Sequence, residues 1–478
     1  MKMIIDGKAV GASNGTTIDV LNPATGKVID TVPAATEDDI KLAVEKAIIG
    51  QKKWAKVPLH QKGEIFEKFL ELVEKDKEKL AQTLSQETGK PITEARGEIA
   101  NIPIAFKAFT ERAKHLYGEV IPPGIEKNQD THIQITVREP IGVVACIIPF
   151  NFPCDLFDQK VAPTLLAGNA AIVKPSTDNP LTLCLLTELL VKAGVTDGAI
   201  QIITGRGSQV GNWLCKNPDV HAITLTGSTA VGIETYKNAA SHLAHISLEL
   251  GGNDAFIVCD DADIDLAVEE LIWGRMYNTG QVCCASKRFI VHNKVKDIFA
   301  KKAIERIKKI KLGDPAADDT ELGCLISEKA AIEVEAQVKL TLEQGGKLLY
   351  GGKRNGAFYE PTVITDIPKD AEVAKDLEIF GPVVSIIGFD TVEEAIEIAN
   401  SSIFGLGGCV FTSNMKTAYQ VALRLECGGV VINGASFFRS FEMPFGGYKY
   451  SGVGTEGVMS TFDEVTRVKT VILKNILS

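Results

Sequence analysis

The sequence predicts an α/β protein built on largely parallel sheets because its apolar periodicity changes repeatedly along the chain, and its composition is that of a compact globular protein. Short runs rich in β-branched residues alternate with longer amphipathic stretches along the chain, as expected of βαβ units. Apolar residues make up 45% of the 478 residues and charged residues 23%, which is an ordinary globular balance. At roughly 100 to 200 residues per domain, a chain of this length should form two or three domains.

The alternation is clearest over residues 141–250. The elements expected there, in chain order, are the strand 141–148, the helix 158–166, the strand 170–173, the helix 181–193 and the strands 199–203 and 221–225. The last of these strands runs directly into a Gly/Ser/Thr turn and a helix. This order of elements is typical of one half of a dinucleotide-binding domain.

Two further regions flank this unit. Residues 38–116 are expected to be mostly helical, with charged faces exposed to solvent. A second α/β region begins near Gly251 and contains the strand 288–292, the helix 295–310 and the strand 381–389. The final segment, 465–473, alternates polar and apolar residues like a strand that no later element covers. Such a terminal edge strand is expected to pair with another domain or subunit.

Composition and charge exclude several classes of function. Lysine and arginine total 51 against 61 aspartates and glutamates, so at a net charge of −10 no overall positive field attracts nucleic acid or anionic lipid. The longest apolar run, 141–150, is interrupted by Gly142 and Pro149 and is much shorter than the ~20 residues that span a bilayer. The first residues lack the apolar core of a secretory signal, so we expect a cytoplasmic protein.

The ten cysteines are scattered through apolar segments. They form no C-x-x-C pair, and no paired histidines complete a zinc site, so no metal is expected. Most of these cysteines are expected to be core thiols in a reducing compartment, with at least one available for chemistry.

Three segments combine a reactive side chain with local glycine or proline. The loop 280–285 carries Cys283 and Cys284; a thiol in such a loop can be an activated nucleophile, although loop cysteines are more often inert. Glu249 ends an apolar strand before two glycines, where burial would make it a usable general base, or where it could simply bond to the following loop. Asn151, held between two prolines, could aim its amide at an oxyanion or merely suit a turn.

Taken together, seven motifs of this chain resemble those of the aldehyde dehydrogenase superfamily. They are PFNFP at 149–153, KPS at 174–176, TGSTAVG at 226–232, LELGG at 248–252, GQVCCA at 280–285, EIFGP at 378–382 and PFGGYKYSG at 444–452. They stand in the family's order, and the resemblance extends from about Asn22 to the C-terminus. Two departures are Phe150, where tryptophan is usual, and Leu225, where phenylalanine usually precedes the TGST turn.

The resemblance implies a fold and a chemistry. The implied fold has a Rossmann-like cofactor-binding domain (1–118 and 141–250), an α/β catalytic domain (251–445) and a small β extension for oligomerisation (119–140 and 446–478). Cys283 would be the nucleophile, and the Asn151 amide would bind the oxyanion together with the backbone N–H of Cys283. Glu249 would deprotonate the water that hydrolyses the resulting thioester. A homo-oligomer, either a dimer or a tetramer, is expected.

The resemblance also implies a nicotinamide cofactor. The residues that it assigns to the phosphates and the nicotinamide are Gly207 in a G-x-G-x-x-x-G loop, Gly227 and Ser228 at a helix N-terminus, and Glu378 and Phe380 at the nicotinamide ribose and ring.

The adenosine end decides between NAD and NADP. Lys174 resembles the family's adenosine-ribose lysine, and Thr177 stands where a glutamate would repel a 2′-phosphate. Arg206 offers a positive charge nearby. NADP is therefore favoured, with NAD as the alternative.

The substrate is implied by the segment 433–443, which is similar to that of lactaldehyde and non-phosphorylating glyceraldehyde-3-phosphate dehydrogenases. Arg439 would bind a hydroxyl, carboxylate or phosphate of a short aldehyde, unless it forms a structural ion pair. Phe438 and Arg112 are further candidate pocket residues. The expected reaction is oxidation of a small hydroxylated or anionic aldehyde to its carboxylic acid.

Three alternative functions remain. A cysteine hydrolase without a nicotinamide is disfavoured by the absence of an obvious Cys–His pair and by the cofactor motifs. A CoA-acylating relative is disfavoured by Glu249, because transfer to a thiol needs no activated water. A non-catalytic binding protein on the same fold is disfavoured because Cys283, Glu249 and Asn151 are present together.

Overall fold

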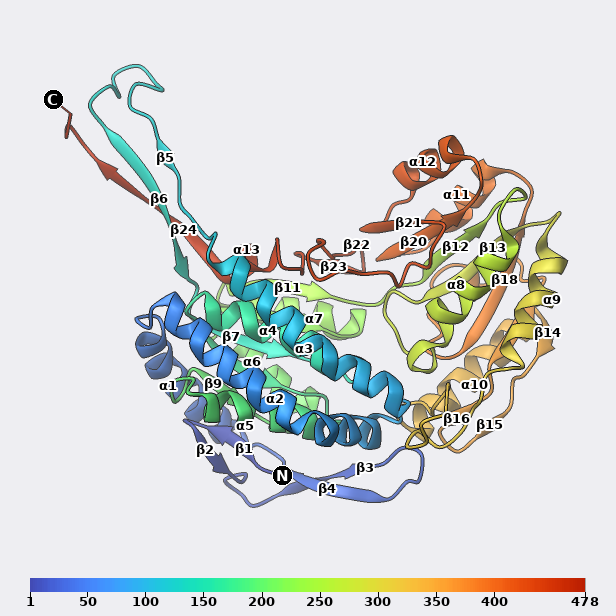
Figure 1. The fold of residues 1–478 in the computed structure, drawn as a ribbon, viewed down its shortest axis with the longest axis horizontal. Helices are drawn as coiled ribbons and strands as arrows, with labels where there is room; N and C mark the ends of the chain where they lie inside the picture. The colour runs from blue at the N-terminus through green and yellow to red at the C-terminus, as the bar shows by residue number, and fades with distance from the viewer. Residues whose placement is uncertain (478) are drawn as a thin grey trace.

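The computed structural model describes residues 1–477, which form two α/β bodies and a projecting β arm (Figure 1). Each body contains a mainly parallel sheet covered by helices on both faces. The predicted fold class is therefore confirmed. No helix within residues 1–477 is long and apolar enough to cross a membrane.

The first body is built on an eight-stranded sheet in the order β2-β1-β9-β8-β7-β10-β11-β23. The five strands from β9 to β11 in this order are parallel, and the outer strands are antiparallel to their neighbours. The bounds are Met3–Ile5 (β1), Lys8–Val10 (β2), Val143–Ile147 (β7), Ala170–Lys174 (β8), Ile200–Ile202 (β9), Ala222–Thr226 (β10), His245–Glu249 (β11) and Gly452–Val453 (β23).

Side chains of the central strand β7 alternate between two hydrophobic cores. Val144 and Cys146 belong to the core beneath α2, α3, α4 and α5, whereas Val143 and Ala145 belong to the core beneath α1, α6 and α7. The helices are Glu37–Trp54 (α1), Leu59–Thr88 (α2), Ile92–Ala113 (α3), Pro153–Leu166 (α4), Leu181–Ala193 (α5), Asn212–Lys216 (α6) and Thr229–Ala240 (α7). Burial of both faces is what a parallel sheet requires.

One helix begins earlier than the sequence pattern predicts. The expected helix 158–166 is observed as α4, which starts at Pro153. Proline suits the first position of a helix because its φ is already helical and its missing N–H has no partner there. Glu98 of α3 accepts the N–H of Cys154 at 2.8 Å, so a side chain distant in sequence caps this helix. Such a cap cannot be found from the local sequence.

The second body is built on a seven-stranded sheet in the order β14-β17-β18-β13-β12-β20-β21, parallel except for β14. Its strands are Asp254–Val258 (β12), Ser286–His292 (β13), Lys347–Tyr350 (β14), Thr362–Thr365 (β17), Val383–Phe389 (β18), Gly407–Phe411 (β20) and Gly429–Ile432 (β21). Helices α8 (Ile264–Met276) and α9 (Lys296–Ile307) cover one face. Helices α10 (Glu328–Glu343), α11 (Val392–Asn400) and α12 (Met415–Arg424) cover the other.

The arm is a three-stranded antiparallel sheet that carries the C-terminal strand (Figure 1). Strand β24 (Thr466–Leu473) pairs along its whole length with β6 (Ile133–Pro140), and β5 (Val120–Ile121) pairs with the other edge of β6. The alternating terminal segment is thus a strand, as predicted, and its partner lies within the same chain. The remaining elements are Thr17–Leu21 (β3), Val28–Pro33 (β4), Arg354–Asn355 (β15), Phe358–Tyr359 (β16), Phe404–Gly405 (β19), Tyr448–Lys449 (β22) and Thr461–Val465 (α13).

Candidate active site

The candidate active site is a cavity of about 300 Å³ that takes its walls from both bodies. Asn151 follows β7, and Cys283 lies in the loop before β13; both line this cavity. Glu249 ends β11, close enough for its carboxylate and the Cys283 thiol to influence each other's ionisation. The fold therefore brings together three residues that are spread over more than a hundred positions of the sequence, from Asn151 to Cys283.

The loop that carries Cys283 has an unusual backbone conformation. Asn278 and Thr279 have positive φ values of 48° and 56°. Gly280 follows with φ of 77°, and a β-carbon there would collide with the carbonyl group of Gly381. The glycine of the GQVCCA motif is thus required by close backbone packing.

The two neighbouring thiols in this loop have pKa values that are shifted in opposite directions. Cys283 is half-buried, and a hydrogen bond with the Cys284 side chain lowers the pKa of Cys283; the positive charges of Lys287 and Arg439 act in the same direction, against burial. The same hydrogen bond, together with burial, raises the pKa of Cys284 well above its usual range. Cys283 is therefore the thiol that ionises more readily, and Cys284 stays protonated beside it.

Glu249 is a buried carboxylate without a hydrogen-bond partner among the described residues. Neither of its oxygens is hydrogen-bonded to any of residues 1–477. Burial raises the pKa of Glu249 well above its usual range, and the charge of Glu456 acts in the same direction. Because no hydrogen bond occupies its oxygens, this carboxylate can accept a proton from a bound molecule such as water.

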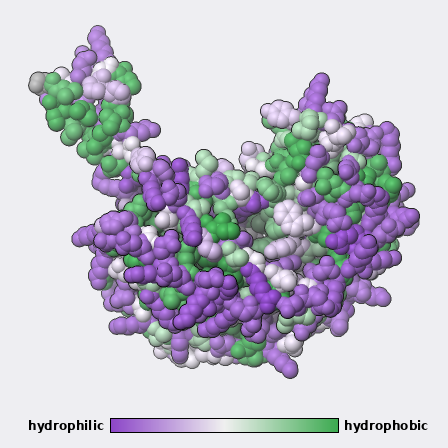
Figure 2. Space-filling view, in the orientation of Figure 1, coloured by the Kyte–Doolittle hydropathy of each residue, from purple (hydrophilic) through white to green (hydrophobic). Residues whose placement is uncertain are grey.

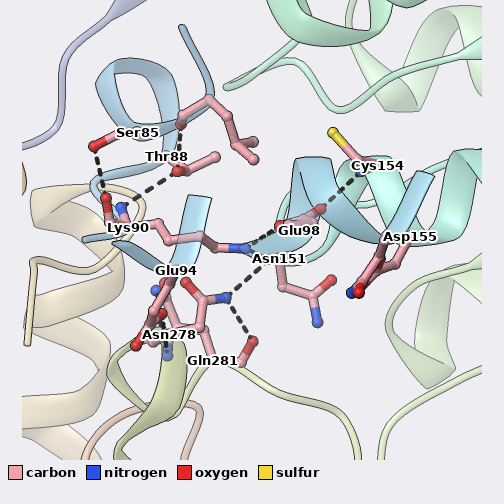
Figure 3. Close-up of polar contacts among 12 residues, drawn as sticks. Ser85, Thr88, Lys90, Glu94, Glu98, Asn151, Cys154, Asp155, Asn278 and Gln281 are labelled. Atoms are coloured by element: carbon pink, nitrogen blue, oxygen red, sulfur yellow. Dashed lines mark hydrogen bonds and ion pairs between the residues drawn. The ribbon is translucent and has the colours of Figure 1, made fainter. Parts of the chain in front are cut away.

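Asn151 is held by its backbone and not by its side chain (Figure 3). Its carbonyl oxygen accepts two hydrogen bonds, from Lys90 Nζ at 3.0 Å and from Asn278 Nδ2 at 2.9 Å. Its side-chain amide forms no hydrogen bond with the described part of the chain and lines the cavity. The amide is thus available to an oxyanion.

The predicted nicotinamide-end residues lie around the Glu249 loop. A β-carbon at Gly251 would be 2.7 Å from Glu378 Oε2, and Glu378 Oε1 accepts the N–H of Gly252 at 3.3 Å. Lys287 pairs with Glu378 at 3.2 Å. The ring of Phe380 meets that of Phe150 edge-on, with centroids 6.0 Å apart.

The predicted phosphate site is the N-terminus of α7. Ser228 caps this twelve-residue helix by accepting the N–H of Val231 at 3.4 Å. Gly227 donates its N–H to the carbonyl of Glu249 at 3.0 Å, which joins the turn to the strand carrying the candidate base. The first-turn amides and the helix dipole suit an anionic group such as a pyrophosphate.

The predicted adenosine-end residues form one cluster. Thr177 Oγ1 donates to the carbonyl of Gly205 at 3.2 Å, and a β-carbon at Gly207 would lie 3.8 Å from Lys174 Nζ. Burial lowers the pKa of Lys174 to about 8. Thr177 and Arg206 also line one cleft of about 540 Å³.

The three predicted substrate residues are placed differently. Arg439 lines the cavity, with its guanidinium 3.9 Å from the ring centroid of Phe445 and 3.7 Å from Glu456. Phe438 is 58% exposed and does not line it; its neighbour Phe437 does, packed against Trp273 and Tyr277. Consecutive residues point in opposite directions here, so the segment alone could not decide between the two phenylalanines.

Helix α3 also contributes a different residue from the one expected. Arg112 is not among the cavity-lining residues, whereas Asn101 of the same helix is. Asn101 donates to Asp155 Oδ1 at 3.1 Å, and beside this pair lies Gln159 of α4.

Besides Asn101, sequence reasoning missed three further residues in or behind this site. Gln159 is buried, lines the cavity and has neither amide atom bonded within residues 1–477. Lys287 Nζ donates to the carbonyl oxygens of Val282 and Cys283, at 2.9 and 2.6 Å. Lys90 bonds Asn151 although it lies in the turn between α2 and α3. Lysines in a turn and at a strand start are ordinarily exposed, so the sequence carried no signal for either.

Comparisons with known proteins identify the family of this chain. A model of the aldehyde dehydrogenase family matches residues 10–471. The mitochondrial succinate-semialdehyde dehydrogenase of Arabidopsis thaliana is 37% identical, over 98% of this chain and 88% of its own. The D-glyceraldehyde dehydrogenase (NADP(+)) of Picrophilus torridus is 36% identical, over 98% and 96%. The structure of betaine aldehyde dehydrogenase from Staphylococcus aureus in complex with NAD+ matches with a TM-score of 0.95 and 35% identity, over 99% of this chain and 95% of that one. The chain therefore belongs to the aldehyde dehydrogenase family, as its seven motifs predicted.

Proposed function

We propose that this enzyme oxidises a small hydroxylated or anionic aldehyde to its carboxylic acid through a thioester on Cys283, with NADP+ favoured over NAD+. Glu249 is the observation that carries the proposal. It is a buried carboxylate near the thiol, and no described residue occupies either of its oxygens. Such a group is suited to activate water, which a hydrolytic aldehyde dehydrogenase needs and a CoA-acylating one does not.

The residues of the site can perform each proton and bonding step. The Cys283 thiolate attacks the aldehyde carbon and gives a thiohemiacetal, whose oxyanion accepts hydrogen bonds from the Asn151 amide and the backbone N–H of Cys283. When bound, the nicotinamide supplies the hydride acceptor that oxidises this carbon to a thioester. Glu249 then takes a proton from water, the hydroxide adds to the thioester carbon, and the C–S bond breaks to release the acid and the thiolate.

Positive charge and a neutral hydroxyl support the preference for NADP+. Lys174 and Arg206 can donate to a 2′-phosphate, and Thr177 adds a hydroxyl without repelling it. Asp178 lines the same cleft, where Lys174 partly offsets its negative charge. The D-glyceraldehyde dehydrogenase among the relatives carries NADP(+) in its name, whereas the betaine aldehyde dehydrogenase structure holds NAD+.

The polar wall of the cavity supports a hydroxylated substrate. Asn101, Gln159 and Asp155 line the cavity together with the aromatic rings of Trp273 and Phe437. The amide of Gln159 can donate one hydrogen bond and accept another, which matches a hydroxyl group better than a carboxylate. Burial raises the pKa of Asp155 to about 7, so this group can also donate when it is protonated.

A panel of aldehydes tests this proposal. Purified enzyme is assayed at 340 nm with glyceraldehyde, lactaldehyde, glyceraldehyde 3-phosphate and succinate semialdehyde, each with NADP+ or NAD+ and with or without CoA. We expect the highest kcat/KM for a hydroxyaldehyde with NADP+, no dependence on CoA, and a loss of at least tenfold for that substrate in Gln159→Leu. Highest activity with succinate semialdehyde, unaffected by Gln159→Leu, would contradict the assignment of a hydroxyaldehyde and leave the anionic alternative; activity with none of the four aldehydes would contradict both.

We also propose the division of labour among the parts of the chain. Residues 1–118 and 141–250 would bind the cofactor, 251–445 would carry the nucleophile, and 119–140 with 446–478 would join subunits into a dimer or tetramer. Exposed apolar side chains on the arm, including Val120, Val468 and Ile472, support the last role. Figure 2 shows hydrophobic surface on the projecting arm. All ten cysteines are free thiols, which suits the proposed cytoplasmic location.

A further inference from the structure

Lys90 is a fully buried charge that lies behind the active site (Figure 3). Its side chain is 0% exposed, and its ammonium forms an ion pair with Glu98, whose side chain is 1% exposed. The same nitrogen donates to the carbonyl oxygen of Asn151 at 3.0 Å and lies 4.3 Å from the ring centroid of Phe152. Lys90 does not line the cavity, so it touches the backbone of the oxyanion donor and not the substrate.

The partner of Lys90 fixes the other side of the same short segment. Glu98 Oε1 accepts the N–H of Cys154 at 2.8 Å, while Glu98 Oε2 receives Lys90. The Lys90–Glu98 pair therefore holds the backbone at two points, the carbonyl group of Asn151 and the N–H of Cys154 in the first turn of α4. The peptide group between residues 151 and 152 has little freedom to rotate.

The nucleophile loop holds the same carbonyl from the opposite direction. Asn278 Nδ2 donates to the oxygen of Asn151 at 2.9 Å, and also to the carbonyl of Gln281 at 3.2 Å. The backbone N–H of Asn278 is accepted by Glu94 Oε2 at 2.9 Å. One carbonyl oxygen thus joins the turn before α3, the oxyanion segment and the loop that carries Cys283.

We propose that Lys90 is a positioning residue: by fixing the carbonyl of Asn151, it aims the Asn151 amide at the oxyanion that forms on the aldehyde. This inference rests on the proposed role of Asn151 as oxyanion donor. A misplacement of about 1 Å at a reacting centre can cost a factor of about 100 in rate. A buried lysine that served stability alone would need only its carboxylate partner, and replacing such a pair by apolar residues is often neutral.

The test is a double-mutant cycle on the first turnover. The variants are Lys90→Met, Asn151→Ala and the combination, and the readout is the rate of the pre-steady-state burst of reduced cofactor at saturating aldehyde. Asn151→Ala should slow the burst about 100-fold, as loss of one oxyanion donor does. Lys90→Met should slow it at least tenfold in the wild-type background, with unchanged cofactor Kd and aldehyde KM, but less than twofold when Asn151 is already alanine.

Further variants separate positioning from stability. Lys90→Met combined with Glu98→Gln removes both charges of the pair and keeps an acceptor for the Cys154 N–H; it should recover the thermal midpoint but not the burst. Lys62→Met is the matched control, because Lys62 is also a buried lysine of the helical hairpin and donates to the carbonyl of Leu166, at the far end of α4, at 3.4 Å. Its burst rate should stay within twofold of wild type.

The outcomes are distinguishable. If Asn151→Ala leaves the burst unchanged, the proposed oxyanion role of Asn151 is wrong. Suppose instead that Asn151→Ala slows the burst but Lys90→Met slows it equally in both backgrounds. The positioning role of Lys90 is then refuted while the proposed function stands. The same conclusion follows if Lys90→Met combined with Glu98→Gln recovers the burst rate together with the thermal midpoint.

Discussion

Replacing Thr177 with glutamate should change the cofactor preference. Thr177 is half-buried and its hydroxyl donates to the carbonyl of Gly205. Lys174 stands three residues before it, and its Nζ would lie 3.8 Å from a β-carbon at Gly207. A carboxylate at this position would face the 2′-phosphate of NADP+ across a partly desolvated gap. NAD+ offers two ribose hydroxyls in the same place, and both can donate to a carboxylate.

The size of the effect follows from charge and distance. Two unit charges about 6 Å apart at an effective dielectric constant of about 20 repel each other by about 2.8 kcal/mol. This free energy corresponds to a loss in NADP+ affinity on the order of a hundredfold. The affinity for NAD+ should stay the same or improve.

Steady-state kinetics with both cofactors measure the change. We expect kcat/KM for NADP+ to fall about 100-fold in Thr177→Glu and less than threefold in Thr177→Gln, a neutral side chain of the same size. A wild-type enzyme that prefers NAD+ tenfold or more, with a ratio that Thr177→Glu does not alter, would refute the reasoning and leave Thr177 without a role in cofactor choice.

Three further predictions concern the thiols, the base and a buried ion pair. Cys283→Ala should abolish aldehyde oxidation and keep cofactor binding, measured by fluorescence titration, while Cys284→Ala should retain much of the activity; equal losses would contradict the assignment. Glu249→Gln should keep the pre-steady-state burst of reduced cofactor but nearly stop steady-state turnover. Because burial raises the pKa of Glu249, the rate of wild-type deacylation should increase as pH rises through that raised pKa, and the deacylation rate of the mutant should not. Lys160→Met should lower stability by about 3–5 kcal/mol in urea unfolding, because it leaves the buried Glu456 with only the longer 3.7 Å ion pair to Arg439, and Glu456→Gln should recover part of the loss.

The sequence predicted the elements better than the contacts between them. Strands such as Ser286–His292 and Val383–Phe389 follow from local apolar patterning, and the observed bounds lie within a few residues of the expected ones. The start of α4 at Pro153 was missed because its cap, Glu98, comes from another helix.

In the candidate site too, local motifs were predicted from the sequence, whereas contacts between distant segments were not. The motifs predict Cys283, Glu249 and Asn151 as site residues. Each of these residues lies beside glycines or prolines, which mark an unusual local backbone in the sequence itself. Which side chains line the cavity depends on packing between the bodies, so Phe437 and Asn101 stand where Phe438 and Arg112 were expected. No local pattern marks Lys90 or Gln159, because each derives its position from residues far away in sequence.

The pairing of β11 with β23 has a consequence for how the protein is made. Leu248 pairs with Val453 and Glu249 with Gly452, so the edge strand beside the candidate base is synthesised about 200 residues after it. At about 5–20 residues per second, a ribosome needs roughly 10 to 40 s to reach that strand. During this interval the nascent first body presents an unpaired parallel edge, to which chaperones or other nascent chains can add a strand. A chain terminated before residue 452 should therefore be inactive and prone to aggregate, even though it contains Asn151, Glu249 and Cys283.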